Sequence, residues 1–155
     1  MGLEKLNSIY QTVIMDHYQH PVSKRKIDQP THHMELLNPT CGDAIQLECR
    51  VEDQIIKEIG FTGHGCAISM ASASMLMKII PGKTISEAQR LVEEFNALIG
   101  GQSQRHMSDQ EIKAEIKEAF LLENIKQFPA RYKCAILAWR ALDKGLKGEE
   151  SGESI

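Results

Sequence analysis

Three of the four cysteines in this chain lie far apart in sequence, each where a loop is expected to give way to regular structure. Cys41 and Asp43 occur in Asn-Pro-Thr-Cys-Gly-Asp, Cys66 follows Gly-His-Gly, and Cys134 follows Arg-Tyr-Lys. A thiol at such a junction can be both exposed and held in place. Three thiols and one carboxylate at a single place suit tetrahedral zinc or an iron–sulfur cluster. The fold is therefore expected to bring these four side chains together.

The composition is that of a single globular domain with one hydrophobic core. The 155 residues are 42% hydrophobic and 25% charged, which is typical of one soluble globular domain. The formal net charge of −3 gives no basic surface for nucleic acid. The sequence has no apolar stretch of membrane-spanning length, and its first residues lack a signal-peptide core. We therefore expect a cytoplasmic protein, in which cysteines are ligands, nucleophiles or core residues rather than disulfides.

Hydrophobic periodicity predicts an α+β fold. Apolar residues at three- and four-residue steps predict a helix over 3–18. Alternation predicts a short strand at 34–37 and an antiparallel hairpin of strands near 45–51 and 55–61. Cys66 then opens a helix that continues to about Ile79. Strands early and helices late favour α+β over a Rossmann-like layout.

The second half of the chain reads as helices with recognisable ends. Capping-box patterns at Thr84 and Ser108 predict helices over 84–99 and 108–120. A last helix is expected from Pro129 or Cys134 to Leu146. We predict a single domain over 1–147 and a disordered polar tail over 148–155.

Several residues that could carry chemistry are better explained as parts of the core or surface. Cys49 keeps phase with the apolar residues of its strand, so it is predicted to be buried and inert. Met70, Met75 and Met77 are interpreted as core filling. His17 and His20 share a helical face without a convincing third ligand, and we expect them at the surface. For Leu6, Ile9 and Tyr10 on the first helix, core packing is favoured over docking.

Cys66 is favoured as a thiolate because it follows two glycines and begins a helix, whose free N–H groups attract negative charge. That position serves a metal ligand and a nucleophile equally. Gly63-x-Gly65 lacks the third glycine of a dinucleotide loop. His64 could act as a base for Cys66, but residues two positions apart at a strand-to-helix turn need not meet.

For Cys41 and Cys134, the sequence allows either a role in a metal centre or an ordinary structural role. Cys41 and Asp43 could reach one ion if the backbone curls through Gly42, or they could form an ordinary Asx turn. Cys134 follows Arg131 and Lys133, which could be a solvated basic helix start. They could equally offset the negative charge of a zinc–thiolate–carboxylate centre and orient an incoming anionic persulfide.

Three motifs in order resemble the U-type iron–sulfur cluster assembly proteins, the family of IscU and the N-terminal domain of NifU. These motifs are Asn-Pro-Thr-Cys-Gly-Asp at 38–43, Gly-His-Gly-Cys-Ala-Ile-Ser at 63–69 and Phe-Pro-Ala-Arg-Tyr-Lys-Cys-Ala at 128–135. The resemblance spans most of the chain. It implies a small three-stranded antiparallel sheet with helices packed against it. It also implies that the cysteines at 41, 66 and 134 meet at one exposed end, with Asp43 beside them.

Departures from the scaffold members are similar to the SufU branch of Gram-positive bacteria. Lys133 stands where scaffold members have histidine, extra residues fall near 99–111, and the chaperone-recognition segment is reduced to 128–131. Members of that branch bind zinc tightly and accept sulfur from a partner cysteine desulfurase. The resemblance thus implies Zn²⁺ held by Cys41, Asp43, Cys66 and Cys134.

The favoured hypothesis is a zinc-dependent sulfurtransferase. A competing ligand from a SufS-like desulfurase would release Cys41, which would accept the persulfide sulfur with support from Arg131 and pass it to downstream assembly machinery. The first alternative is a non-enzymatic scaffold that holds iron or a transient [2Fe–2S] cluster on the same residues. The second is a purely structural zinc site in a partner-binding domain.

Overall fold

Three consecutive antiparallel strands form one layer of the fold, in a computed structural model that describes the backbone of residues 3–155 and the side chains of residues 8–155. Because β2 is central and alternates inward and outward, Ile45, Leu47 and Cys49 are buried while Gln46 is exposed. This confirms the predicted α+β class, the antiparallel hairpin and the buried position of Cys49. The strands are β1 (His32–Asn38), β2 (Asp43–Glu52) and β3 (Ile55–His64).

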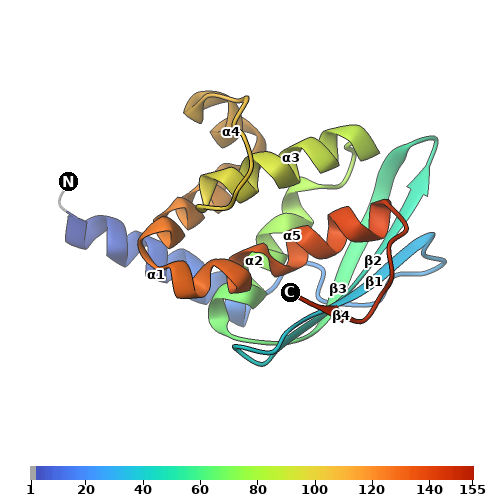
Figure 1. Cartoon of the computed structure of the whole chain (residues 1–155), viewed down its shortest axis with the longest axis horizontal. Helices are drawn as coiled ribbons and strands as arrows, with labels where there is room; N and C mark the ends of the chain where they lie inside the picture. Colours follow the sequence, from blue (N-terminus) through green and yellow to red (C-terminus); the bar gives the residue numbers. More distant parts are fainter. Residues whose placement is uncertain (1–2) are drawn as a thin grey trace.

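Helices cover one face of this sheet (Figure 1). α5 packs across β1 and β2 and also against α2, while α1 packs on α2. In the core, the Trp139 ring of α5 stacks on Phe95 of α3 with 3.8 Å between ring centroids. Within residues 3–155, none of the helices is both long and apolar enough to span a bilayer. The helices are α1 (Leu3–Gln19), α2 (Ala67–Ile79), α3 (Ile85–Leu98), α4 (Asp109–Ile116) and α5 (Tyr132–Leu146).

The predicted helix caps are present, and one helix ends earlier than predicted. The Thr84 side chain accepts from Glu87 N, and Ser108 forms a reciprocal capping box with Glu111. α4 stops at Ile116 rather than near residue 120, because Lys117 adopts a positive φ of 52° that the α-helix cannot contain. The chain continues as the 3-10 segments η1 (Lys117–Gln127) and η2 (Pro129–Arg131), which lead into α5.

The structure corrects the predicted disordered tail. Glu153–Ser154 forms a short strand, β4, that pairs in parallel with β1 and extends the sheet order to β3-β2-β1-β4 (Figure 1). The pairing is made by main-chain groups, which polar residues supply as well as apolar ones do. A polar composition therefore did not reveal it.

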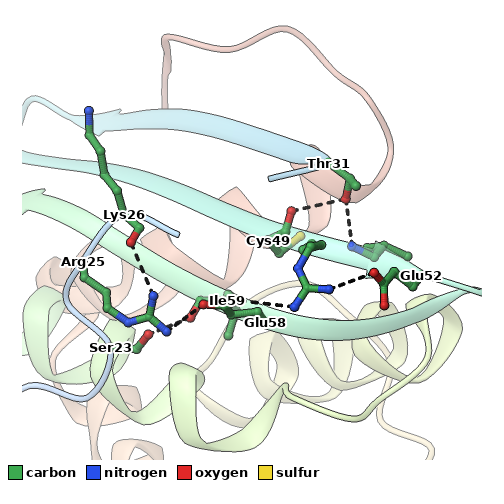
Figure 2. A network of polar contacts seen from close by, with 10 residues as sticks. Ser23, Arg25, Lys26, Thr31, Cys49, Glu52, Glu58 and Ile59 are labelled. Atoms are coloured by element: carbon green, nitrogen blue, oxygen red, sulfur yellow. Dashed lines mark hydrogen bonds and ion pairs between the residues drawn. The ribbon is translucent and has the colours of Figure 1, made fainter. Parts of the chain in front are cut away.

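The opposite edge of the sheet is covered by the loop that follows α1 (Figure 2). Phe61 N donates to Ser23 O at 3.2 Å, and the Ser23 hydroxyl donates to Ile59 O at 2.7 Å. Gly60 lies so near this loop that a Cβ there would be 2.4 Å from the carbonyl oxygen of Arg25. Arg25 also pairs with Glu58 at 2.9 Å, so the outer edge of β3 is closed.

His17 is buried, which corrects the surface position predicted for it. The residue is 4% exposed, and its Nδ1 lies 2.7 Å from Ser74 Oγ on α2. Its Nε2 contacts the Glu118 carboxylate of η1. His20 is exposed as predicted. The helical face shared by the two histidines thus splits between core and solvent.

Candidate metal centre

The Cys41 loop is a tight turn that joins β1 to β2. Cys41 N donates to Asn38 O at 3.3 Å, and Gly42 N donates to Pro39 O at 3.4 Å. Gly42 has a φ of +70°, a conformation that glycine adopts without steric cost. The turn leaves Cys41 partly exposed at the end of the sheet.

Asp43 links this turn to the start of α2. It is 2% exposed at the first position of β2, and both of its oxygens accept hydrogen bonds. Oδ2 accepts from Asn38 Nδ2 at 2.9 Å, and Oδ1 accepts from Cys66 N at 2.9 Å. The carboxylate is therefore held in a fixed orientation by two donors, with its charge satisfied inside the protein.

Cys66 is the N-cap of α2, as its sequence position predicted. Its sulfur accepts from Ser69 N at 3.5 Å, so a free N–H group of the helix end points at it. Gly65 makes this approach possible, since a Cβ there would lie 2.6 Å from Asp43 Oδ1 and 2.4 Å from Ser69 Oγ. The thiol itself is partly exposed.

Cys134 is fully buried in the first turn of α5, and its Sγ lies 3.2 Å from Cys41 Sγ. Asn38 Nδ2 approaches the same sulfur at 3.7 Å. Burial, followed by the thiols of Cys41 and Cys66 and the charge of Asp43, raises the pKa of Cys134 far above its ordinary range. A site that gathers anionic groups in this way favours a bound cation.

The donor set fits a soft divalent metal. One ligand atom each from Cys41, Asp43 and Cys134 lies within 4.8 Å of the others. Neighbouring ligands of a tetrahedral zinc with bonds near 2.3 Å are about 3.8 Å apart, so this spacing is compatible. The main-chain N–H of Cys66 donates to Asp43, so Cys66 is linked to this group, but its sulfur is not one of the three ligand atoms. Thiolate sulfur favours zinc or iron–sulfur chemistry over calcium or magnesium.

The two basic residues before Cys134 have different positions. Arg131 is exposed at the end of η2, and interaction with Cys134, then attraction to Cys66 and Cys41, raises its pKa. Lys133 instead donates to the Ile155 main-chain oxygen at 3.1 Å. Charge compensation of the centre by Arg131 therefore stays a prediction, and the ammonium of Lys133 is bonded to the edge of the sheet instead.

Sequence reasoning missed one residue of the centre. Asn38 has a buried amide beside both Asp43 and Cys134, and its place directly before Pro39 in the motif was the available signal. The Tyr10 hydroxyl is buried with no hydrogen-bond partner among the described residues. Burial, the largest effect, raises the pKa of Tyr10, whereas Arg131 lowers it and Cys66 raises it.

Other residues considered from sequence lie elsewhere. His64 is exposed at the end of β3, and burial raises the pKa of the Cys49 thiol to about 12. Ile9 is 38% exposed, whereas Met70, Met75 and Met77 are buried as predicted. The side chain of Leu6 lies outside the described residues.

The fold is α+β with an antiparallel sheet, and cysteines and an aspartate cluster at one end of that sheet. Together these features define a class of metal-binding assembly proteins. The model of the NifU-like N-terminal domain matches residues 9–135, and the chain belongs to this family of iron–sulfur cluster assembly proteins.

Relatives of this chain include both a sulfurtransferase and scaffold proteins of the family. The chain is 38% identical over 147 residues to the zinc-dependent sulfurtransferase SufU of Bacillus subtilis, covering 95% of each. It is 36% identical over 155 residues to the iron–sulfur cluster assembly scaffold protein IscU of Streptococcus pyogenes, covering all of this chain and 93% of that one. A crystal structure of a SUF-system scaffold protein from Fervidobacterium islandicum superposes with a TM-score of 0.75 at 29% identity, covering 90% of this chain and 98% of that one.

Proposed function

We propose that this protein is a zinc-dependent sulfur acceptor of iron–sulfur cluster assembly, which takes persulfide sulfur from a cysteine desulfurase onto Cys41 in the cytoplasm. The observation that carries the proposal is the unequal setting of two adjacent thiols. Their Sγ atoms are 3.2 Å apart, yet Cys134 is buried in a helix while Cys41 is partly exposed on a turn. The Cys134 thiol is fixed in the protein interior, whereas the Cys41 thiol is accessible to a partner protein.

Cys41, Asp43, Cys66 and Cys134 would hold the zinc ion. Three of them already present ligand atoms within 4.8 Å of one another, and Cys66 is tied to the group through Asp43. Zinc, when bound, keeps its cysteine ligands deprotonated at neutral pH. The name of the Bacillus subtilis relative supports zinc for this donor set.

The transfer step uses Cys41 as the nucleophile. Its thiolate attacks the outer sulfur of the desulfurase cysteine persulfide, and the S–S bond of that persulfide breaks. The desulfurase cysteine leaves as a thiolate, and the outer sulfur remains on Cys41 as a new persulfide. Cys41 can move with its turn, whereas Cys66 and Cys134 belong to helix starts. Arg131, exposed beside the thiols, orients the anionic persulfide.

The test is desulfurase turnover of free cysteine with and without the zinc-loaded, iron-free protein. Sulfur transfer predicts a large acceleration, lost in Cys41→Ala although that variant stays folded. If Cys41→Ala and Cys134→Ala both simply unfold the protein, the zinc site is structural. No acceleration by the folded wild-type protein would refute the sulfur-acceptor role.

A second candidate is a scaffold on which a [2Fe–2S] cluster is carried as cargo. The scaffold name of the Streptococcus pyogenes relative, at nearly the same identity, favours it. Asp43 would then be the labile oxygen ligand that lets the cluster leave, whereas Lys133 in place of histidine argues against it. Anaerobic reconstitution with iron and sulfide distinguishes the two candidates, because only the scaffold predicts a stable visible cluster that can be passed on.

A further inference from the structure

The outer edge of β1 is occupied by residues 151–155, here called the edge segment (Figure 1). Gly152 N donates to Glu35 O at 2.8 Å, and Ile155 N donates to Leu37 O at 2.9 Å. The pairing is parallel, with Glu153 opposite Leu36 and Ser154 opposite Leu37. It is short and irregular, because the two donors are three residues apart whereas their acceptors are two residues apart. The edge segment is thus a strand added to a sheet edge rather than a loop resting on the surface.

Side chains of the edge segment meet specific partners from α5. Glu153 Oε2 lies 3.7 Å from Lys144 Nζ, and the Ile155 side chain packs against the hydrophobic core. The Ile155 main-chain oxygen accepts from Lys133 Nζ at 3.1 Å. The edge therefore offers a cation for an acidic residue and an apolar contact for an aliphatic residue two positions later.

The edge segment is held weakly compared with the core of the sheet. Its residues up to Ser154 are exposed, and the paired part is only Glu153–Ser154. Gly148, between α5 and the edge segment, and Gly152, within the segment, have φ values of +70° and +90°, which glycine adopts without steric cost. Exposed ion pairs such as Lys144–Glu153 contribute about 1 kcal/mol or less. Such a segment opens locally without global unfolding.

We propose that the outer edge of β1 is a strand-addition site for an extended polypeptide that carries an acidic residue followed two positions later by an aliphatic one, and that residues 151–155 occupy it in cis. Main-chain hydrogen bonds supply affinity in this mode, and contacts to alternate side chains supply specificity. The partner is an extended segment of another protein with this acidic-x-aliphatic pattern.

The position of the edge links such a partner to the metal centre. β1 leads directly into Asn38 and the Cys41 turn, and Lys133 immediately precedes Cys134. A peptide seated on β1 therefore ends beside the cluster of thiols. This holds whether the centre accepts sulfur or carries a cluster, so the inference is independent of the proposed function.

The experiment is an NMR titration of a variant that lacks residues 149–155 with a synthetic peptide of the sequence of residues 150–155. We expect amide shifts at Glu35, Leu37 and Lys133. The full chain should bind the same peptide at least roughly 10-fold more weakly, because its own edge segment competes at high effective concentration. Peptides with lysine at the position of Glu153 or serine at that of Ile155 should lose binding.

Full-chain Gly152→Pro provides a second route to an open edge, because proline has no N–H and a φ near −65°. Glu150→Ala is its control, at an exposed residue of the same connection. Absence of shifts in a folded open variant, equal binding by the full chain, or equal binding of the altered peptides overturns the proposal. If both open variants unfold, the edge segment is integral to the fold and the proposal is equally wrong.

Discussion

Asn38 and Asp43 face one another at the last paired position of β1 and β2, and the Asn38 amide donates to Asp43 Oδ2 at 2.9 Å. The same amide nitrogen lies 3.7 Å from Cys134 Sγ. One side chain thus contacts both a carboxylate and a thiol that belong to different layers of the fold. Residues that orient metal ligands through hydrogen bonds commonly affect metal affinity.

Replacement of Asn38 by alanine is expected to weaken zinc binding. Loss of the amide leaves the buried Asp43 carboxylate with one fewer donor, and such outer contacts are worth about 10- to 100-fold in metal affinity. The same unsatisfied oxygen should lower the free energy of unfolding of the metal-free protein by about 1–3 kcal/mol. Competition with a chromophoric chelator and urea unfolding measure the two effects.

The matched control is Asn124→Ala, an asparagine of η1 for which no side-chain hydrogen bond is found among the described residues. It should leave zinc affinity unchanged. Equal affinities for Asn38→Ala and wild type would show that the Asn38 amide does not orient the ligands.

Gly65→Ala should disturb the centre through steric contact alone. The new Cβ would lie 2.6 Å from Asp43 Oδ1 and 2.4 Å from Ser69 Oγ, so the carboxylate must move from its bond to Cys66 N. Because ligand geometry is affected directly, we expect zinc affinity to fall by about 10-fold or more. Equilibrium dialysis against a zinc buffer provides the measurement.

Gly82→Ala separates this effect from the general cost of replacing a glycine. Gly82 has a φ of +90° with no atom within 4 Å of the added Cβ, so its replacement strains the backbone in open space. We expect it to cost about 1 kcal/mol or more of stability, with zinc affinity kept. If Gly82→Ala weakened zinc binding as much as Gly65→Ala, the steric explanation would fail.

Cys49 should make the protein less stable at alkaline pH. Burial raises its pKa from 9.0 to about 12, so the folded protein keeps the thiol protonated while the unfolded chain ionises it. Its contribution is therefore intact below pH 9.0 and declines between pH 9.0 and about 12. The loss is at most about 1.4 kcal/mol per pH unit in that window.

Urea unfolding of wild type and Cys49→Ala from pH 8 to pH 11 tests this pH dependence. The quantity followed is the difference between their free energies of unfolding at each pH. The gap between the two proteins should narrow as pH rises, because only the wild type carries this penalty. A pH-independent gap would mean that the Cys49 thiol ionises at the same pH in the folded and unfolded states.

Local patterns in the sequence predicted those features that local physics determines. Alternation placed Cys49 inward on β2, and glycines before a helical run placed Cys66 at a helix N-cap. The order of the motifs that marks the family predicted that the side chains of Cys41, Asp43 and Cys134 lie close together, and they do. The first two signals lie within a few residues of the features they predict, whereas the third depends on the family resemblance.

Contacts between distant segments had no such signal. The strand at Glu153–Ser154 depends on an open edge of β1, more than 100 residues earlier in the chain. Lys133 was considered either a solvated residue or a charge partner of the centre, and its ammonium donates to the Ile155 main-chain oxygen. Only the folded arrangement decides which neighbour a long side chain meets.

His17, for which the sequence wrongly predicted a surface position, yields a further prediction. Its ring joins three segments, because Nδ1 lies 2.7 Å from Ser74 Oγ and Nε2 contacts Glu118. Ser74 Oγ also accepts from Val22 N at 2.8 Å, which fixes the loop after α1. His17 therefore holds α1, α2 and η1 together at a distance from the thiols.

His17→Ala should lower the free energy of unfolding by about 2–4 kcal/mol, since it removes a buried ring and the hydrogen bonds that join α1 to Ser74 and Glu118. His20→Ala, at an exposed position one turn further along, should change it by less than about 0.5 kcal/mol. Because His17 contacts Ser74 and Glu118 rather than the thiols, zinc affinity of the folded His17→Ala protein should equal that of wild type. Chemical unfolding and zinc competition on the same samples check both halves. A loss of zinc affinity without a loss of stability would place His17 in the metal centre and contradict its structural role.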